Sequence, residues 1–171
     1  MKKIFRWMVV IALLMAFTPA PALAKKILRF PLRGNPAVWP VSQPSLINTL
    51  MIQKVMFNGL VKYSKKDGVT VVPDLAVSWT HSPDVKVWTF KLRKGVRWHD
   101  GKPFTAADVE FNYKVHKVKK YRSRFHRQMK TLEKFEVLDS HTVRLTFSQP
   151  MAALTVQMGY NIPVFPKHLL E

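Results

Sequence analysis

Residues 72–109 read VPDLAVSWTHSPDVKVWTFKLRKGVRWHDGKPFTAADV, and this stretch decides how the rest of the chain is interpreted. Its clearest pattern is an alternation over residues 87–92. One set of side chains is Val87, Thr89 and Lys91, and the other is Trp88, Phe90 and Leu92. Period-two alternation of aromatic and β-branched residues is typical of a half-buried strand. The sequence therefore predicts a strand here with one apolar face.

Turn residues bound this strand, and a helix start follows. Pro83-Asp84 precedes the strand and Lys94-Gly95 follows it, and Asp100-Gly101 with Pro103 makes a second turn. Thr105 lies three residues before Asp108, which is the spacing of a capping box. We therefore expect a helix from about residue 106.

The order of short sequence words in this region points to a known family. The words are GLVKY at 59–63, VPDLA at 72–76, SW at 78–79, WTFKLR at 88–93, GV at 95–96, HDG at 99–101, PFTA at 103–106 and DV at 108–109. In this order and spacing they resemble the N-terminal region of the family 5 extracytoplasmic solute-binding proteins, which are the peptide- and nickel-binding subunits of ABC importers. The resemblance extends more loosely from Leu28 to residues 166–168.

The resemblance implies an α+β (mixed α/β) chain, the N-terminal part of a type II periplasmic-binding-protein-like fold. It implies four parts: a signal peptide at 1–24, the first strand and loop of the larger lobe at 25–45, a small α/β domain at 46–160, and a return segment toward the larger lobe at 161–171. Proteins of this family are much longer than this chain. We therefore expect a truncated receptor without its second lobe, which binds ligand poorly alone because a cleft needs two walls.

One position departs from the family pattern. Residues 84–86 read Asp-Val-Lys, where the family commonly has Asp-Gly in the turn. A β-branched residue rarely adopts positive φ, so Val85 argues against a turn that needs that conformation.

The first 24 residues have the pattern of a secretory signal peptide. Lys2, Lys3 and Arg6 form a basic start, residues 7–17 are apolar but short for a membrane span, and Ala22-Leu23-Ala24 is an A-x-A cleavage site. The alternative is a membrane anchor. Cleavage would leave Lys25 as the mature N-terminus and a periplasmic protein. The absence of cysteine excludes a lipid-modified N-terminal cysteine, a disulfide framework and a thiolate metal site.

Charge adds a second hypothesis. The formal charge is +18, and removal of three leader cations leaves 18 − 3 = +15. Residues 114–130 hold eight Lys or Arg and no acid, interleaved with Tyr121 and Phe125. Such a segment could bind anionic polymers, or it could be a solvated helix end and loop. No nucleic-acid motif accompanies the charge, so no nucleic-acid partner is expected.

Site residues are expected only through the resemblance. Ile27, Leu28 and Phe30 suggest a first strand, and the loop at 33–45 follows it. In the resembled family this loop can approach the ligand, which makes Arg33, Asn35 and Trp39 candidate substrate contacts. The alternative is that Trp39 packs on the core and Arg33 is solvated.

The remaining patterns predict further elements. We expect a helix over 45–58, a hairpin of strands 60–63 and 69–72, a hairpin around 139–141, and a short helix over 151–158, after which Pro163 and Pro166 end regular structure. On the first helix Met51 and Met56 are interpreted as core residues. On the helix from 106, the predicted apolar stripe is Ala107, Phe111, Val115 and Val118.

Nothing in the sequence supports an enzyme. The six histidines include no H-E-x-x-H pair, and no nucleophile elbow, P-loop or dinucleotide fingerprint occurs. His99 beside Asp100 is interpreted as part of a structural turn. We therefore expect no cofactor, no metal ligand set and no catalytic residue. The resemblance implies a monomeric periplasmic receptor that captures oligopeptides or dipeptides and delivers them to an ABC permease in the inner membrane, with a nickel chelate as the alternative ligand.

Overall fold

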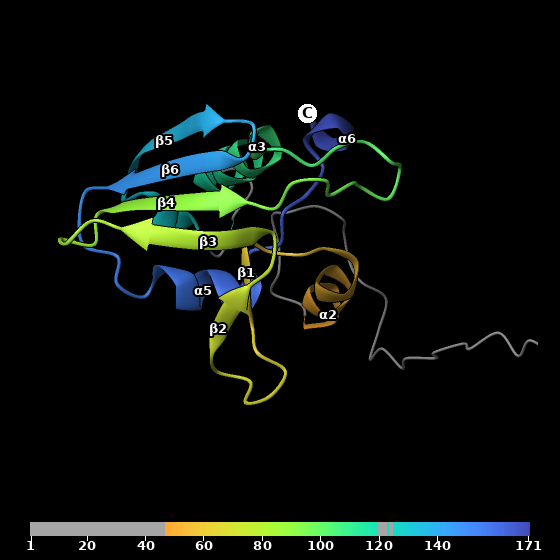
Figure 1. Ribbon diagram of the computed structural model, residues 1–171, viewed down its shortest axis with the longest axis horizontal. Helices are drawn as coiled ribbons and strands as arrows, with labels where there is room; N and C mark the ends of the chain where they lie inside the picture. Colours follow the sequence, from red (N-terminus) through yellow and green to blue (C-terminus); the bar gives the residue numbers. More distant parts are fainter. Residues whose placement is uncertain (1–46, 120–122, 124) are drawn as a thin grey trace, which may run out of the picture. The chain divides into compact units, whose positions relative to one another are not determined.

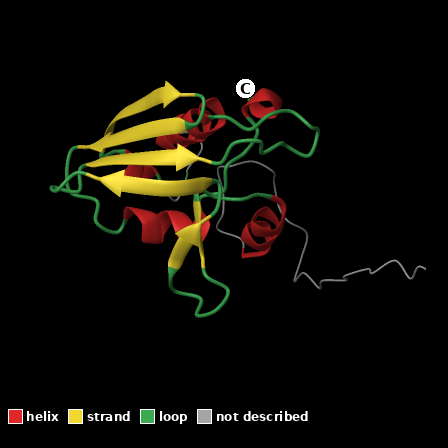
Figure 2. Cartoon of the chain, viewed as in Figure 1, coloured by secondary structure: helices red, strands yellow, loops and turns green. Residues whose placement is uncertain are grey.

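The computed structural model describes residues 47–119, 123 and 125–171 (Figure 1). Its helices are α2 (Ile47–Met56), α3 (Ala106–Lys117), α4 (His126–Met129), α5 (Leu154–Asn161) and α6 (Lys167–Leu170). Its strands are β1 (Val61–Tyr63), β2 (Val71–Pro73), β3 (Ala76–His81), β4 (Val87–Leu92), β5 (Leu132–Asp139) and β6 (Thr142–Phe147). Helices and strands both contribute (Figure 2), which confirms the mixed α/β class.

The strands form two antiparallel sheets. Strands β1 and β2 pair as a hairpin, and the larger sheet has the order β3-β4-β6-β5. The predicted strand at 87–92 is confirmed as β4, with Trp88, Phe90 and Leu92 at 3%, 0% and 3% exposure. Both predicted hairpins are also confirmed.

Strand β3 was not predicted. It pairs with β4, but its register shifts between Ala76 and Ser78. This irregularity interrupts the period-two alternation of side chains along β3, and that alternation is the pattern that predicts a strand from sequence.

The core lies between one face of the larger sheet and the helices. Phe90 and Leu145 from the sheet belong to the same buried cluster as Val109 and Tyr113 of α3 and Met158 of α5. At the start of α3 the backbone N–H of Thr105 donates to the Asp108 carboxylate at 2.9 Å, which confirms the predicted capping contact.

The predicted apolar stripe on α3 was wrong by about one position. The buried side chains are Ala106, Asp108, Val109, Asn112, Tyr113 and His116. In contrast, Val118 is 43% exposed, and Ala107, Phe111 and Val115 are only half-buried. The buried face includes three polar residues, and their hydrogen bonds offset the cost of burying them. Hydropathy periodicity does not reveal such residues.

Two interpretations of single residues were also wrong. Met51 and Met56 are 42% and 44% exposed, so they do not fill the core. Val85 has φ 57°, so the turn does contain a residue in the left-handed conformation, although that residue is a valine. Its neighbours hold it there, because its N–H donates to the Ser82 carbonyl at 2.9 Å and its own carbonyl accepts from Trp88 Nε1 at 3.1 Å.

The C-terminal region differs in detail from the prediction. Helix α5 begins at Leu154, three residues later than expected. Regular structure does not end at Pro166, because α6 starts at the next residue. Proline is compatible with a helix start, where its missing N–H would have no helical partner. The predicted division into 1–24, 25–45, 46–160 and 161–171 stays a prediction.

Candidate functional site

The three residues predicted to contact ligand, Arg33, Asn35 and Trp39, lie outside the described residues. The predicted signal peptide and the strand at 27–30 lie there as well. These predictions therefore remain predictions, and the candidate site is built from residues 47–171 where the structure describes them.

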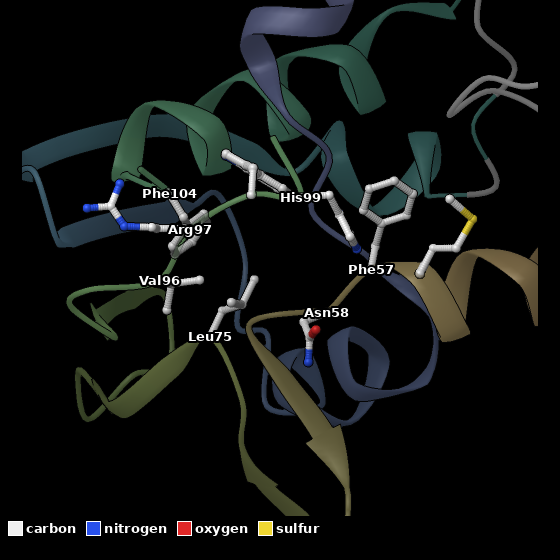
Figure 3. Close-up of a pocket in the computed structure, with 9 residues that line it drawn as sticks. Phe57, Asn58, Leu75, Val96, Arg97, His99 and Phe104 are labelled. Atoms are coloured by element: carbon white, nitrogen blue, oxygen red, sulfur yellow. The ribbon is translucent and has the colours of Figure 1, made fainter. Parts of the chain in front are cut away.

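A pocket of about 190 Å³ lies where the end of α2 meets the loop between β4 and α3 (Figure 3). Figure 3 shows Phe57 and His99 on one side and Leu75 and Val96 on the other. The full lining consists of Met56, Phe57, Asn58, Leu75, Val96, Arg97, Trp98, His99 and Phe104. The wall is therefore mainly apolar and aromatic, with a few polar groups, which is the usual composition of a site for a small organic ligand.

The loop over residues 96–104 is folded back on itself. Arg97 and Pro103 form an isolated antiparallel bridge, and the Trp98 N–H donates to the Lys102 carbonyl at 2.8 Å. Gly101 occupies the tip with φ 85°, a conformation that favours glycine. The guanidinium of Arg97 donates to the Gly101 carbonyl at 2.8 Å. Arg97 therefore stabilises the loop.

Aromatic contacts hold the pocket walls in place. The Phe57 ring lies edge-on to Phe165 at 4.9 Å and to His99 at 6.1 Å between centroids. Trp98 lies edge-on to Phe104 at 5.8 Å. The Nε1–H of Trp98 is buried and has no hydrogen-bond partner within the described part of the chain. That indole group is a donor that a bound acceptor could satisfy.

The polar group of Asn58 is already engaged. Its Nδ2 lies 2.9 Å from each carboxylate oxygen of Asp74. The same carboxylate also accepts from Lys62 at 3.1 Å. These contacts join the end of α2 to the strands β1 and β2, so Asn58 positions the pocket wall.

The return segment at 161–171 packs against residues that line the pocket. The Val164 N–H donates to the Asn58 carbonyl at 2.9 Å. Buried Asn112 on α3 holds Phe165 through two hydrogen bonds to its backbone, and the Asp108 carboxylate accepts from the Lys167 N–H at 3.0 Å. The buried polar residues of α3 therefore place Phe165 against Phe57.

One ion pair lies at the tip of the pocket loop. His168 Nε2 is 2.6 Å from Asp100 Oδ2. This hydrogen bond, with help from the Lys102 N–H, lowers the pKa of the Asp100 carboxyl below its usual value of 3.8. The neighbouring pair His99 and Asp100 makes no such contact. The interpretation of that pair as part of a structural turn is supported.

The size of the pocket limits what it can do alone. Sites that enclose small organic ligands measure about 300–1,000 Å³, and this pocket is smaller. No three His, Asp or Glu side chains gather in a way that could hold a metal ion among the residues that the structure describes. None of the helices within the described ranges is long and apolar enough to cross a membrane.

Comparison with known proteins identifies the family. Residues 70–170 match the sequence profile of the bacterial extracellular solute-binding proteins, family 5, in its middle region. This match covers the larger sheet and helices α3 to α6. The chain belongs to this family.

Individual relatives agree with this assignment. The chain is 43% identical over 83 residues to the nickel-binding periplasmic protein of Escherichia coli K12, which covers 45% of this chain and 16% of that protein. It is 32% identical over 127 residues to di/tripeptide-binding protein 1 of Pseudomonas aeruginosa. This match covers 64% of this chain and 24% of that protein. The resemblance noted from the sequence words is thereby confirmed.

A solved structure shows the same fold. The periplasmic binding protein AgaA from A. tumefaciens R10, in complex with agropinic acid, superposes with a TM-score of 0.65 at 32% identity. The superposition covers 70% of this family 5 chain and 24% of AgaA. The chain spans about a sixth to a quarter of the length of the proteins that it matches.

Sequence reasoning did not single out the residues that line the pocket. Phe57 and Trp98 are ordinary hydrophobic residues in the sequence, and nothing in their spacing shows that they meet. Asp108 was predicted only as a cap of α3, and the contacts of Asp108 and Asn112 with the return segment were not predicted. A sequence signal did exist for these two, because polar residues four apart on a helix face between apolar neighbours are unusual unless they bind something.

Proposed function

We propose that this chain is part of the substrate-binding component of an ABC importer, which captures a small solute in the periplasm and delivers it to a permease in the inner membrane. The family match over residues 70–170 is the observation that carries this proposal. It supports a role in binding and delivery without a catalytic step, because the relatives are named as binding proteins.

The favoured ligand is a dipeptide or oligopeptide. A similar relative is named as a di/tripeptide-binding protein. The apolar and aromatic pocket beside Phe57 suits an amino-acid side chain. In this proposal the pocket is one wall of the ligand site, and Arg33, Asn35 and Trp39 are further contacts. Its volume of about 190 Å³ implies weak binding by this wall alone.

A nickel chelate is the second candidate ligand. The observation that favours it is the 43% identity to a nickel-binding periplasmic protein. A chelated metal brings its own ligands, so this candidate does not require a cluster of metal-binding side chains in the protein.

Peptide binding can be tested through the indole signals of the tryptophans. A mixture of tripeptides is titrated into the ¹⁵N-labelled chain, and the Nε1–H signals of Trp98 and Trp88 are followed by NMR. We expect the Trp98 signal to shift, because Trp98 lines the pocket and its buried indole N–H has no partner in the described residues. Trp88 is the internal control, because its Nε1 is bonded to the Val85 carbonyl.

The same titration with the nickel–histidine chelate distinguishes the two ligands. A Trp98 shift with the chelate and none with tripeptides would favour the nickel candidate. No shift with either would overturn the assignment of this pocket as a wall of the ligand site.

Export is proposed on the sequence pattern of residues 1–24. The test is the intact mass of the protein recovered from the periplasm. A mass that begins at Lys25 supports cleavage after Ala24, and an uncleaved mass in the membrane fraction supports the anchor alternative.

The alternative of a basic polymer-binding protein is not favoured by the contacts of residues 114–130. Lys114 pairs with Glu110 at 2.9 Å, and Lys117 Nζ donates to the Leu132 carbonyl at 2.8 Å. Phe125 is 8% exposed and packs in the core, so it is not available to stack on a base.

A further inference from the structure

The larger sheet has a second face that no described helix covers. In Figure 2 the four strands lie in front of helix α3, which packs on the core side. The pairing of the strands brings polar side chains together on the opposite side, here called the outer face. Its members are Ser78, Thr80, Val87, Thr89, Lys91, Lys134, Glu136, Asp139, Thr142, Arg144 and Thr146.

Arg144 lies at the centre of the outer face. In the strand register it is opposite Thr89 on β4 and opposite Glu136 on β5, and Thr80 lies beyond Thr89. One row of side chains therefore crosses all four strands. Arg144 is half-buried. It makes no hydrogen bond or ion pair to any residue that the structure describes.

The acids on this face offset only part of its positive charge. They are Glu136, whose carboxylate is bound by Lys134 at 2.7 Å, and Asp139, which lies opposite Thr142 and accepts from its hydroxyl. The cations are Lys91, Lys134 and Arg144, so three positive charges face two negative charges. The side chains of Thr89 and Thr146 make no hydrogen bond within the described residues, so their hydroxyls can donate to a bound group.

The face is also concave. A shallow hollow of about 460 Å³ lies over it, lined by Thr80, His81, Ser82, Val87, Thr89, Lys134, Glu136, Arg144 and Thr146. A partly desolvated guanidinium on the floor of a hollow favours an anion with two oxygens in one plane, because the planar fork of arginine matches a carboxylate. Its lining comes from all four strands, so the hollow is broad and shallow, and it suits an extended chain better than a small molecule.

We propose that the outer face, centred on Arg144, is a docking site for an acidic segment of another protein. The carboxylates of that segment bind Arg144, Lys91 and Lys134, and the hydroxyls of Thr89 and Thr146 add hydrogen bonds. The charge of the face and its hydroxyl lining favour an acidic peptide over a lipid surface. The outer face presents only Val87 as an apolar side chain, and aromatic or leucine anchors for a membrane are not among its members. This site is separate from the pocket beside Phe57.

The test measures binding of a fluorescein-labelled octaglutamate peptide by fluorescence anisotropy at physiological ionic strength. R144Q is expected to weaken binding about tenfold, because it removes the fork and its charge. R144K is expected to weaken it about threefold, because the charge remains and the bidentate geometry is lost. The double variant K91Q/K134Q is expected to weaken binding of the peptide as well, without a change at Arg144.

The matched control removes two positive charges elsewhere. Lys65 and Lys66 lie on the exposed turn between β1 and β2, so K65Q/K66Q lowers the net charge as much as K91Q/K134Q does. We expect this control to bind octaglutamate as the unmodified chain does. An equal loss in the control would overturn the proposal, because binding would then follow net charge and not the outer face.

A vesicle experiment separates the two classes of partner. Vesicles of phosphatidylglycerol and phosphatidylethanolamine are sedimented with the chain and with R144Q. Binding to vesicles that R144Q abolishes, together with no binding of octaglutamate, would overturn the proposal in favour of a lipid surface. Octaglutamate binding that depends on Arg144 supports it. Unchanged thermal unfolding of each variant confirms that the fold is intact.

Discussion

Asn112 on helix α3 and Phe165 on the return segment exchange two hydrogen bonds across 53 positions of sequence. Asn112 Nδ2 donates to the Phe165 carbonyl at 2.8 Å, and the Phe165 N–H donates to Asn112 Oδ1 at 3.0 Å. Both residues are buried, at 1% and 3% exposure. The Asn112 side chain thus satisfies both backbone groups of Phe165, as a residue of a neighbouring strand would. It thereby fixes the path of the return segment beside the pocket.

Replacement of Asn112 by alanine is predicted to destabilise the protein by about 2–4 kcal/mol. The change removes two hydrogen bonds from the buried backbone of Phe165, and a buried polar group that loses its hydrogen bond costs about 1–3 kcal/mol. The measurement is the free energy of unfolding in urea. Lys114→Ala on the exposed side of the same helix is the matched control, and its cost is expected to be below about 0.5 kcal/mol. Equal costs for the two variants would contradict the role of Asn112.

Val85 provides a test of backbone strain. Its φ of 57° is unfavourable for a β-branched residue. The stabilities of Val85→Gly and Val85→Ala are compared with each other. Both variants lose the branched side chain, so most of the loss of packing cancels in the difference. We predict that the glycine variant is more stable than the alanine variant by about 1 kcal/mol, because only glycine adopts this conformation freely.

The control for this comparison is an exposed valine whose φ is not positive. Val77 on β3 is 42% exposed and is not among the residues with positive φ. At Val77 the order is expected to be reversed, with alanine more stable than glycine by about 0.5–1 kcal/mol. The same order at both positions would show that the turn imposes no strain. Thermal unfolding of the four variants provides the measurement.

The ion pair of His168 and Asp100 predicts a pH effect. Because the folded-state pKa of Asp100 is below its unfolded value of 3.8, this group stabilises the fold above that value. The contribution is lost as the pH falls through the folded-state pKa. Asp100→Asn is therefore expected to be less stable than the unmodified chain at neutral pH, and the difference is expected to disappear at strongly acidic pH.

An NMR titration of the carboxyl groups checks the cause directly. In His168→Gln the pKa of Asp100 is expected to rise toward its usual value, because the largest cause of its shift is removed. Asp67 is an internal reference, because its pKa is lowered by Thr70 in a distant turn and does not depend on His168. An unchanged pKa of Asp100 in the variant would show that the pair does not form in solution.

The elements that the sequence predicts correctly depend on short-range signals. The alternation at 87–92, the Asp-Gly turn before β2 and the Thr105–Asp108 cap each involve residues a few positions apart. The apolar side of β4 is unambiguous because its three inward residues are all large. Local propensity and tertiary structure agree at these positions, so the sequence is sufficient.

The incorrect predictions share a different cause. Asn112 and His116 are polar residues on the buried face of α3, and each has a hydrogen-bond partner outside the helix, Phe165 and Ser123. A hydropathy pattern assigns such residues to the solvent side, which shifts the predicted face of the helix. The pocket was not predicted for the same reason, since Phe57 and Phe165 meet only in the folded chain.

His116 leads to a prediction about stability in mild acid. Its side chain is 3% exposed, its Nδ1 lies 2.7 Å from Ser123 Oγ, and its Nε2 has no partner in the described part of the chain. Burial lowers its pKa from 6.5 to about 4. The unfolded chain therefore binds a proton in this range and the folded chain does not. Stability is expected to fall between pH 6.5 and 4, by up to about 1.4 kcal/mol per pH unit from this group.

The variant His116→Gln tests the prediction through the change of its unfolding free energy with pH. That change does not depend on any loss of stability at neutral pH. Urea unfolding is measured at pH 7 and pH 5 for the unmodified chain, for His116→Gln and for His99→Gln. His99 is exposed, so His99→Gln is the matched control for the loss of one imidazole at the surface. His116→Gln is expected to be less sensitive to acid than the unmodified chain, because its unfolded state no longer gains that proton. An equal loss of stability between pH 7 and pH 5 in all three proteins would show that His116 titrates normally in the folded chain.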